Sequence, residues 1–220
     1  ISWESRNIDP MLGIQYGIMS LEAADICGNQ YYMVMAYNAM AMNERKLGHF
    51  SEALNCYRKA LAVAEQNGFC ELSALEYSNI GNTFFYKQSI DSAICYETEA
   101  LRRADSINSN SIYSRVYMNM GLINKQLGNY SKAIEYFEMA YFIRRDSLLL
   151  YDDCSAPIGE MAGIYIDTHD YESAKQILSL YLGDDAIQIT EGQASIVWNQ
   201  LAQVYYKMGN QTVGISEEEM

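Results

Sequence analysis

Residues 114–144 read SRVYMNMGLINKQLGNYSKAIEYFEMAYFIR, and the rest of the chain copies this stretch. Its first half carries apolar residues at helical spacing, namely Val116, Tyr117, Met120 and Ile123. Gly128 suits the left-handed residue that ends a helix, and Asn129 can cap the start of the next one. A second apolar stripe follows on Ala133, Ile134, Phe137 and Ala140. The stretch therefore predicts a helical hairpin, in which Gly121 permits a close approach and Phe137 fills the space around it.

The hairpin recurs at a fixed interval. Ala133 is preceded by Ala93 and Ala53 at steps of 40 residues and followed by Ala174 at a step of 41. Four further slots keep this interval: Tyr37, Tyr77, Tyr117, Ile158 and Trp198; Met40, Ile80, Met120, Met161 and Leu201; Ala41, Gly81, Gly121, Ala162 and Ala202; and Phe50, Ile90, Tyr130 and Tyr171. Chance does not keep five slots in register over this distance, so the sequence predicts a repeat array.

This order of aromatic, large apolar and small residues, then a turn, then Ala and aromatic slots, resembles the tetratricopeptide repeat. The resemblance covers nearly the whole chain and implies an all-α fold, a right-handed superhelical solenoid of antiparallel helix pairs. The family's usual repeat is about 34 residues, and its late Pro is missing here. The longer period is similar to the long-repeat variety found in bacterial signalling and scaffold proteins.

The repeat predicts a single solenoid over residues 1–220, because each hairpin contacts mainly its neighbours and needs no domain boundary. Its expected parts are a half repeat, four hairpins and an incomplete repeat, at 1–29, 31–67, 72–107, 112–149, 155–183 and 186–220. A lone half repeat exposes a face that its partner should cover. The expectation is therefore a piece of a longer protein, with self-association through exposed terminal repeats as one consequence.

Composition excludes several classes of partner. The formal net charge is −13, which repels nucleic-acid phosphates, so direct nucleic-acid binding is not expected. No apolar run approaches the roughly 18 residues of a membrane span. The five cysteines form no CxxC pair, and their odd number argues against a disulfide framework. This favours a reducing, cytoplasmic compartment, while an export signal on a longer parent chain would place the protein in the periplasm.

The sequence offers little for catalysis. The two histidines, His49 and His169, fall in turns between paired helices, and no nucleophile motif, phosphate loop or zinc signature is present. The tyrosine and methionine stripe is typical of core packing. We therefore expect no enzyme, no cofactor and no metal. A small-molecule hydrolase on a helical array stays open as an alternative, because the many carboxylates prevent exclusion of an acid–base pair.

The resemblance also implies a concave groove lined by particular slots of each first helix. The peptide-binding residues predicted in these slots are Asn38, Arg45, Asn79, Asn82, Arg115, Asn119, Lys125, Asn199, Gln203 and Lys207. A side-chain amide offers a donor and an acceptor, which suits the backbone of an extended peptide. The basic residues favour an acidic ligand. On this hypothesis Asn79→Ala with Asn119→Ala abolishes peptide affinity and leaves stability nearly unchanged.

Together these features predict a non-enzymatic module that binds a protein or peptide in its groove. By analogy with long-repeat proteins, it is expected to be a sensory or scaffolding part of a larger bacterial regulatory protein. The main alternative is a structural scaffold that assembles a complex through its helix edges, with the groove incidental.

Overall fold

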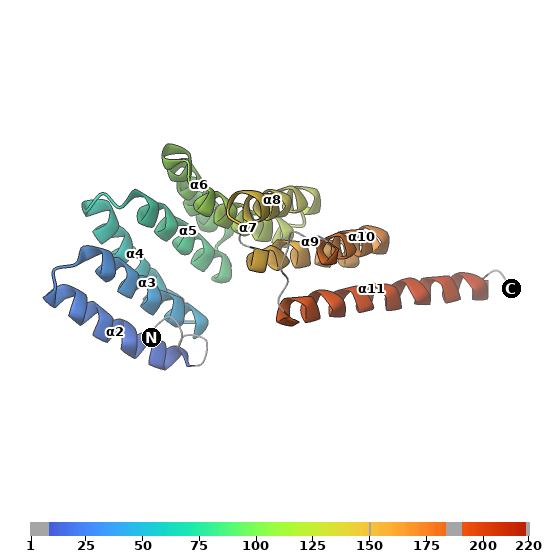
Figure 1. The fold of residues 1–220 in the computed structure, drawn as a ribbon, viewed down its shortest axis with the longest axis horizontal. Helices are drawn as coiled ribbons and strands as arrows, with labels where there is room; N and C mark the ends of the chain where they lie inside the picture. Colours follow the sequence, from blue (N-terminus) through green and yellow to red (C-terminus); the bar gives the residue numbers. More distant parts are fainter. Residues whose placement is uncertain (1–8, 150, 184–190, 219–220) are drawn as a thin grey trace. The chain divides into compact units, whose positions relative to one another are not determined.

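The computed structural model describes residues 9–149, 151–183 and 191–218, and all regular structure in these ranges is helical (Figure 1). The helices pack in consecutive pairs, which confirms the predicted all-α architecture. Contacts divide the chain into two compact units, Ile1–Asn119 and Met120–Met220. No helix in the described ranges is long and apolar enough to cross a bilayer.

The first unit is a series of helices of nearly equal length. It contains α2 (Pro10–Ile26), α3 (Gln30–Lys46), α4 (Phe50–Gln66), α5 (Cys70–Tyr86), α6 (Ile90–Ile107) and the first part of α7 (Asn110–Gln126). Each helix lies beside the next in Figure 1, and α3 packs on α4 as α5 packs on α6. One core cluster joins α3, α4 and α5 through Ala41, Ala53, Leu54, Tyr57 and Ile80. Small residues in the predicted slots thus lie where helices cross.

The second unit is less regular. It contains the rest of α7, then α8 (Tyr130–Phe142), a π-helical turn η1 (Ile143–Ser147), a 3₁₀ turn η2 (Tyr151–Cys154), α9 (Ser155–Asp167), α10 (Tyr171–Leu182) and α11 (Glu191–Glu218). α8 packs on α9, α9 on α10, and α10 on α11. The second helix of the hairpin quoted above therefore ends earlier than those of the first unit.

The turn between α7 and α8 tests the local expectations. Gly128 has a φ of 76°, the left-handed conformation predicted for it. The capping role predicted for Asn129 is wrong, because its side chain makes no capping hydrogen bond to α8. Its amide nitrogen lies instead 3.5 Å from Asn124 Oδ1. The left-handed glycine is therefore the part of the predicted turn that the structure confirms.

Gly121 and Phe137 make the predicted close contact between α7 and α8. A Cβ built on Gly121 would lie 2.5 Å from the Phe137 ring, whose residue is fully buried. Gly121→Ala is therefore expected to lower the free energy of unfolding by about 1–3 kcal/mol, because the ring must move in a packed core. Urea denaturation followed by circular dichroism would measure this change.

Gly209→Ala is the matched control, because a Cβ there meets nothing within 4 Å. This helical position is expected to gain up to about 1 kcal/mol from alanine. Adding Phe137→Leu to Gly121→Ala should recover part of the loss. Equal effects of Gly121→Ala and Gly209→Ala would show that the contact carries no strain.

Candidate functional site

Two glutamates are completely buried in the first unit. Glu76 on α5 and Glu97 on α6 each have 0% exposed surface. In the other repeats the slot of Glu76 holds Ala36, Val116, Pro157 and Val197, and the slot of Glu97 holds Tyr57, Phe137 and Leu178. Carboxyl groups therefore replace apolar core residues at two neighbouring places. Buried carboxyl groups destabilise a fold unless they are hydrogen-bonded.

Glu97 receives hydrogen bonds from two helices. Asn119 Nδ2 on α7 donates to Glu97 Oε1 at 2.8 Å, and Ser78 Oγ on α5 lies 2.9 Å from Glu97 Oε2. Asn119 Nδ2 also lies 3.1 Å from Ser78 Oγ. Gly81 leaves room for this carboxyl group, because a Cβ there would lie 2.8 Å from Glu97 Oε1. Gly81 and Glu97 thus meet in the same slots as Gly121 and Phe137.

Glu76 has its own set of donors. Asn38 Nδ2 on α3 donates to Glu76 Oε1 at 2.5 Å, and Asn79 Nδ2 on α5 donates to Glu76 Oε2 at 3.3 Å. Asn38 is 7% exposed. Both oxygens of Glu76 therefore have partners inside the protein, as do those of Glu97.

Burial is the main cause of the raised pKa values of Glu76 and Glu97. It raises the pKa of Glu76 to about 7, against the hydrogen bonds from Asn38 and Asn79 and the charge of Arg115. It raises the pKa of Glu97 to about 8, against the hydrogen bonds from Ser78 and Asn119 and the charge of Arg115. Desolvation of the charged form explains both directions. Glu97 accordingly keeps its proton at neutral pH, and Glu76 titrates there.

The network extends from Asn119 toward α3. Asn82 Nδ2 donates to Asn119 Oδ1 at 3.0 Å, and Arg45 Nη1 donates to Asn82 Oδ1. The Arg45 guanidinium also lies 5.1 Å from the centre of the Tyr86 ring. Hydrogen bonds therefore connect α3 to α5 and α5 to α7. Successive first helices are linked by the side chains that the sequence assigns to the groove.

The structure places the ten predicted residues in three situations. In the first unit it brings together Asn38, Arg45, Asn79, Asn82 and Asn119, and their side chains bond to one another or to the two buried glutamates. Arg115 on α7 is exposed and forms no hydrogen bond or ion pair within the described ranges. In the second unit Lys125 Nζ lies 2.9 Å from Glu160 Oε2, and α11 carries Asn199, Gln203 and Lys207 exposed. Peptide binding by these residues stays a prediction.

Glu76 and Glu97 were not predicted from the sequence. The signal was present, because comparing each slot across the repeats reveals a glutamate among apolar residues. A charged residue at such a position indicates either a surface slot or a buried carboxyl group with partners. The asparagines that supply those partners were assigned instead to an external ligand.

The cysteine and histidine side chains of the described ranges form no metal-binding group. Within the described ranges no group of three or more His, Cys, Asp or Glu residues could hold a metal ion. No disulfide bond joins the five cysteines, which are Cys27, Cys56, Cys70, Cys95 and Cys154. His49 Nδ1 lies 2.8 Å from Glu44 Oε2, and His169 Nδ1 lies 2.9 Å from the Tyr171 hydroxyl. Both imidazoles are thus in local turn contacts.

Comparison with known proteins agrees with the repeat pattern. Two models of the tetratricopeptide repeat match the sequence, at residues 32–106 and 114–145. The chain is a tetratricopeptide repeat protein. Repeats of this class serve as protein-interaction or scaffold modules, because their stacking produces extended binding surfaces. A comparison with curated proteins gave no match.

Several solved structures share the fold. BtubC (BKLC) from P. vanneervenii is 20% identical, with a TM-score of 0.74 over 89% of this chain and 83% of its own. A STAND protein with a tetratricopeptide repeat sensor from Pyrococcus horikoshii is 20% identical, with a TM-score of 0.69 over 94% of this chain and 33% of its own. Aspartyl phosphate phosphatase F from Bacillus subtilis is 17% identical, with a TM-score of 0.58 over 93% of this chain and 57% of its own. The chain thus spans only part of the last two proteins.

Proposed function

We propose that the first unit binds an extended peptide segment of a partner protein along the face formed by α3, α5 and α7. The observation that carries the proposal is the chain of hydrogen bonds Arg45–Asn82–Asn119, which joins different groove slots on the first helices of three successive repeats. These slots therefore belong to one continuous face of the unit. A face held by internal bonds loses little freedom when a ligand binds.

The network changes which atoms are expected to touch the peptide. The amides of Asn38 and Asn119 are bonded to the buried carboxyl groups, so their role is to position neighbours. Asn79 is half-buried and uses only its amide nitrogen, at 3.3 Å from Glu76, which leaves its oxygen as an acceptor. Tyr86 is 49% exposed beside Arg45. Asn79 and Tyr86 are therefore the proposed contacts, with the Arg45 charge favouring an acidic segment.

We further propose that the chain is a non-enzymatic, sensory or scaffolding part of a larger bacterial regulatory protein. The repeat of the Pyrococcus horikoshii protein is named a sensor, and the present chain covers 33% of that protein. This likeness supports a role as one part of a longer chain.

The test is binding of a fluorescent peptide library, graded in acidity, to the protein and to Asn79→Ala/Tyr86→Ala. A peptide present at about 100 times its dissociation constant should raise the free energy of unfolding by roughly 2.7 kcal/mol. The double variant is expected to weaken this peptide at least tenfold, because it removes an acceptor and an aromatic contact. Asn55→Ala/Tyr130→Ala is the matched control, since both of its residues are exposed elsewhere. Equal affinity of the two double variants would show that the peptide does not bind to this face.

A further inference from the structure

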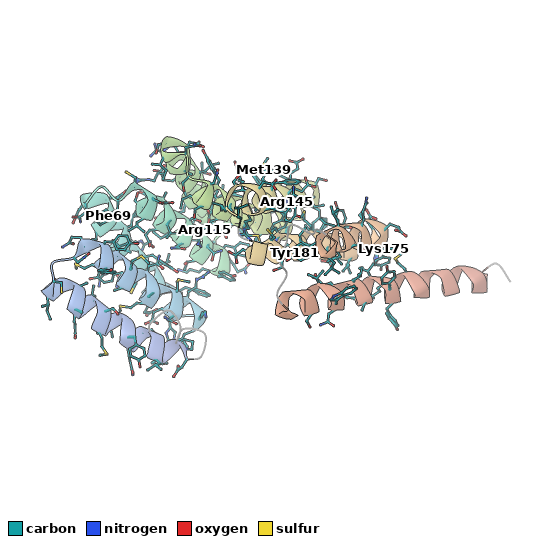
Figure 2. All side chains as sticks on the ribbon, in the orientation of Figure 1. Phe69, Arg115, Met139, Arg145, Lys175 and Tyr181 are labelled. Carbon is teal, nitrogen blue, oxygen red and sulfur yellow. The ribbon has the colours of Figure 1, made fainter. Side chains whose placement is uncertain are left out.

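A second feature of the first unit is a pocket of about 430 Å³ near the first turns of α3, α5 and α7. Its apolar wall comprises Tyr31, Phe69, Leu72, Leu75 and Ile112. Phe69 and Arg115, labelled in Figure 2, lie at the start of α5 and in the second turn of α7. The volume falls in the range of small-molecule sites, roughly 300–1,000 Å³.

The apolar wall suits a large side chain. The Tyr31 and Phe69 rings meet edge to face, with 6.2 Å between their centres. Ile112 is 1% exposed, while Tyr31 is 47% exposed. The pocket thus has a buried apolar floor and an exposed aromatic side chain at its edge. An aromatic or branched aliphatic group entering it would bury its surface against both, which favours binding.

Two opposite charges share this pocket without neutralising each other. Glu71 and Arg115 both line it, and neither forms an ion pair within the described ranges. Ser109 Oγ donates to Glu71 Oε1 at 3.0 Å and lies 3.4 Å from the Ile112 amide, which anchors this carboxylate at the start of α7. Arg115 follows six residues after Ser109, about 9 Å along the helix axis. Its side chain leans toward the start of the helix, and so toward the pocket.

We propose that this pocket binds a small zwitterion, an α-amino acid with a large apolar side chain. Its carboxylate accepts hydrogen bonds from the Arg115 guanidinium, its ammonium group faces Glu71, and its side chain packs on Tyr31 and Phe69. A ligand with only negative charges is disfavoured by Glu71 and by the net charge of −13. The site uses neither Asn79 nor Tyr86, so it does not depend on the proposed peptide face.

Isothermal titration calorimetry of the whole chain with three ligands tests the charges separately. The ligands are phenylalanine, phenylalanine amide, which lacks the carboxylate, and N-acetylphenylalanine, which lacks the ammonium group. Phenylalanine is expected to bind at least tenfold more tightly than either derivative. Arg115→Gln should weaken phenylalanine and N-acetylphenylalanine at least fivefold and leave the amide unchanged. Glu71→Gln should weaken phenylalanine and the amide and leave N-acetylphenylalanine unchanged.

Glu52→Gln on α4 and Arg58→Gln on the same helix are the matched controls, since both residues are exposed and lie outside the pocket. Neither control should change any of the three affinities. Thermal midpoints of all four variants within about 2 °C of the parent would show that each is folded. Equal binding of phenylalanine and its derivatives overturns the proposal, as does the lack of binding at millimolar phenylalanine. Tighter binding of N-acetylphenylalanine would also overturn it and point to the last residue of a peptide.

Discussion

The first unit is expected to lose stability as the pH rises from about 4.5 to about 8, the reverse of ordinary acid denaturation. The pKa of Glu76 is raised to about 7 and that of Glu97 to about 8, from 4.5 for a free glutamate. Between these values the folded state binds more protons than the unfolded state, so each rise in pH favours unfolding. One pKa unit corresponds to about 1.4 kcal/mol, so the two raised pKa values should together make stability depend on pH by several kcal/mol.

Below about pH 4.5 a different carboxylate makes the stability increase with pH. Hydrogen bonds from Arg102, and then from Arg103, lower the pKa of Glu99 to about 2. Its contribution is complete above about pH 4.5 and is lost as the pH falls toward 2. The decline between pH 4.5 and 8 is therefore assigned to the buried pair. Hydrogen–deuterium exchange of peptides from α5 and α6, corrected for intrinsic exchange at each pH, would measure it locally.

Glu97→Gln with Glu76→Gln is the decisive variant. Glutamine keeps the shape and an acceptor oxygen but cannot ionise, so the pH dependence of protection should largely disappear. At pH 8 this variant should be more stable than the parent, because it no longer has to bury a charge. Glu52→Gln, at an exposed position of α4, is the control and should leave the slope unchanged. An unaltered slope in the double glutamine variant would show that Glu76 and Glu97 ionise freely in the folded protein.

Much of the fold follows from the sequence because its signals are local or strictly periodic. The spacing of Ala53, Ala93, Ala133 and Ala174 identifies the helix crossings, and all four are fully buried. The contact of Gly121 with Phe137 is also predictable, since both slots recur. The π-helical turn after Phe142 carries no such periodic signal and depends on how α8 meets its neighbours. The division of contacts near Asn119 is likewise absent from a pattern that continues through it.

The site was harder to predict because hydrogen bonds between repeats depend on distance in space. The positions of Asn38, Asn79, Asn82 and Asn119 within their repeats place them on one face of the unit. These positions do not say whether an amide points outward or inward. Their partners Glu76 and Glu97 lie in slots that the repeat reserves for apolar residues, so periodicity alone assigns them no role. The two glutamates are recognised by comparing them with the apolar residues at the same positions of the other repeats. The hydrogen-bond distances in the structure then connect them to the asparagines.

Asn119→Ala is expected to destabilise the first unit strongly, in contrast to the small effect that a peptide-binding amide on a wet surface would have. Asn119 is 9% exposed, donates to Glu97 and Ser78, and accepts from Asn82. Its removal takes away the partner of Glu97 Oε1 and of Asn82 Nδ2, while Glu97 Oε2 keeps its contact with Ser78. Each group left unsatisfied costs about 1–3 kcal/mol. We expect a loss of about 3 kcal/mol in urea denaturation at pH 6, where Glu97 is protonated. Asn79→Ala should cost less, because its hydrogen bond to Glu76 is long, at 3.3 Å.

Asn124→Ala is the matched control on the same helix. Asn124 is 5% exposed, and its amide donates at 2.8 Å to the Met120 carbonyl of its own helix, so about 1 kcal/mol should be lost there. Combining Asn119→Leu with Glu97→Leu should be less harmful than Asn119→Ala, because no buried carboxyl group is then left without its donor. The energies of the two single leucine variants and the double variant give the coupling directly. A midpoint unchanged by Asn119→Ala would instead show that this amide is free, and would return it to the residues available for a peptide.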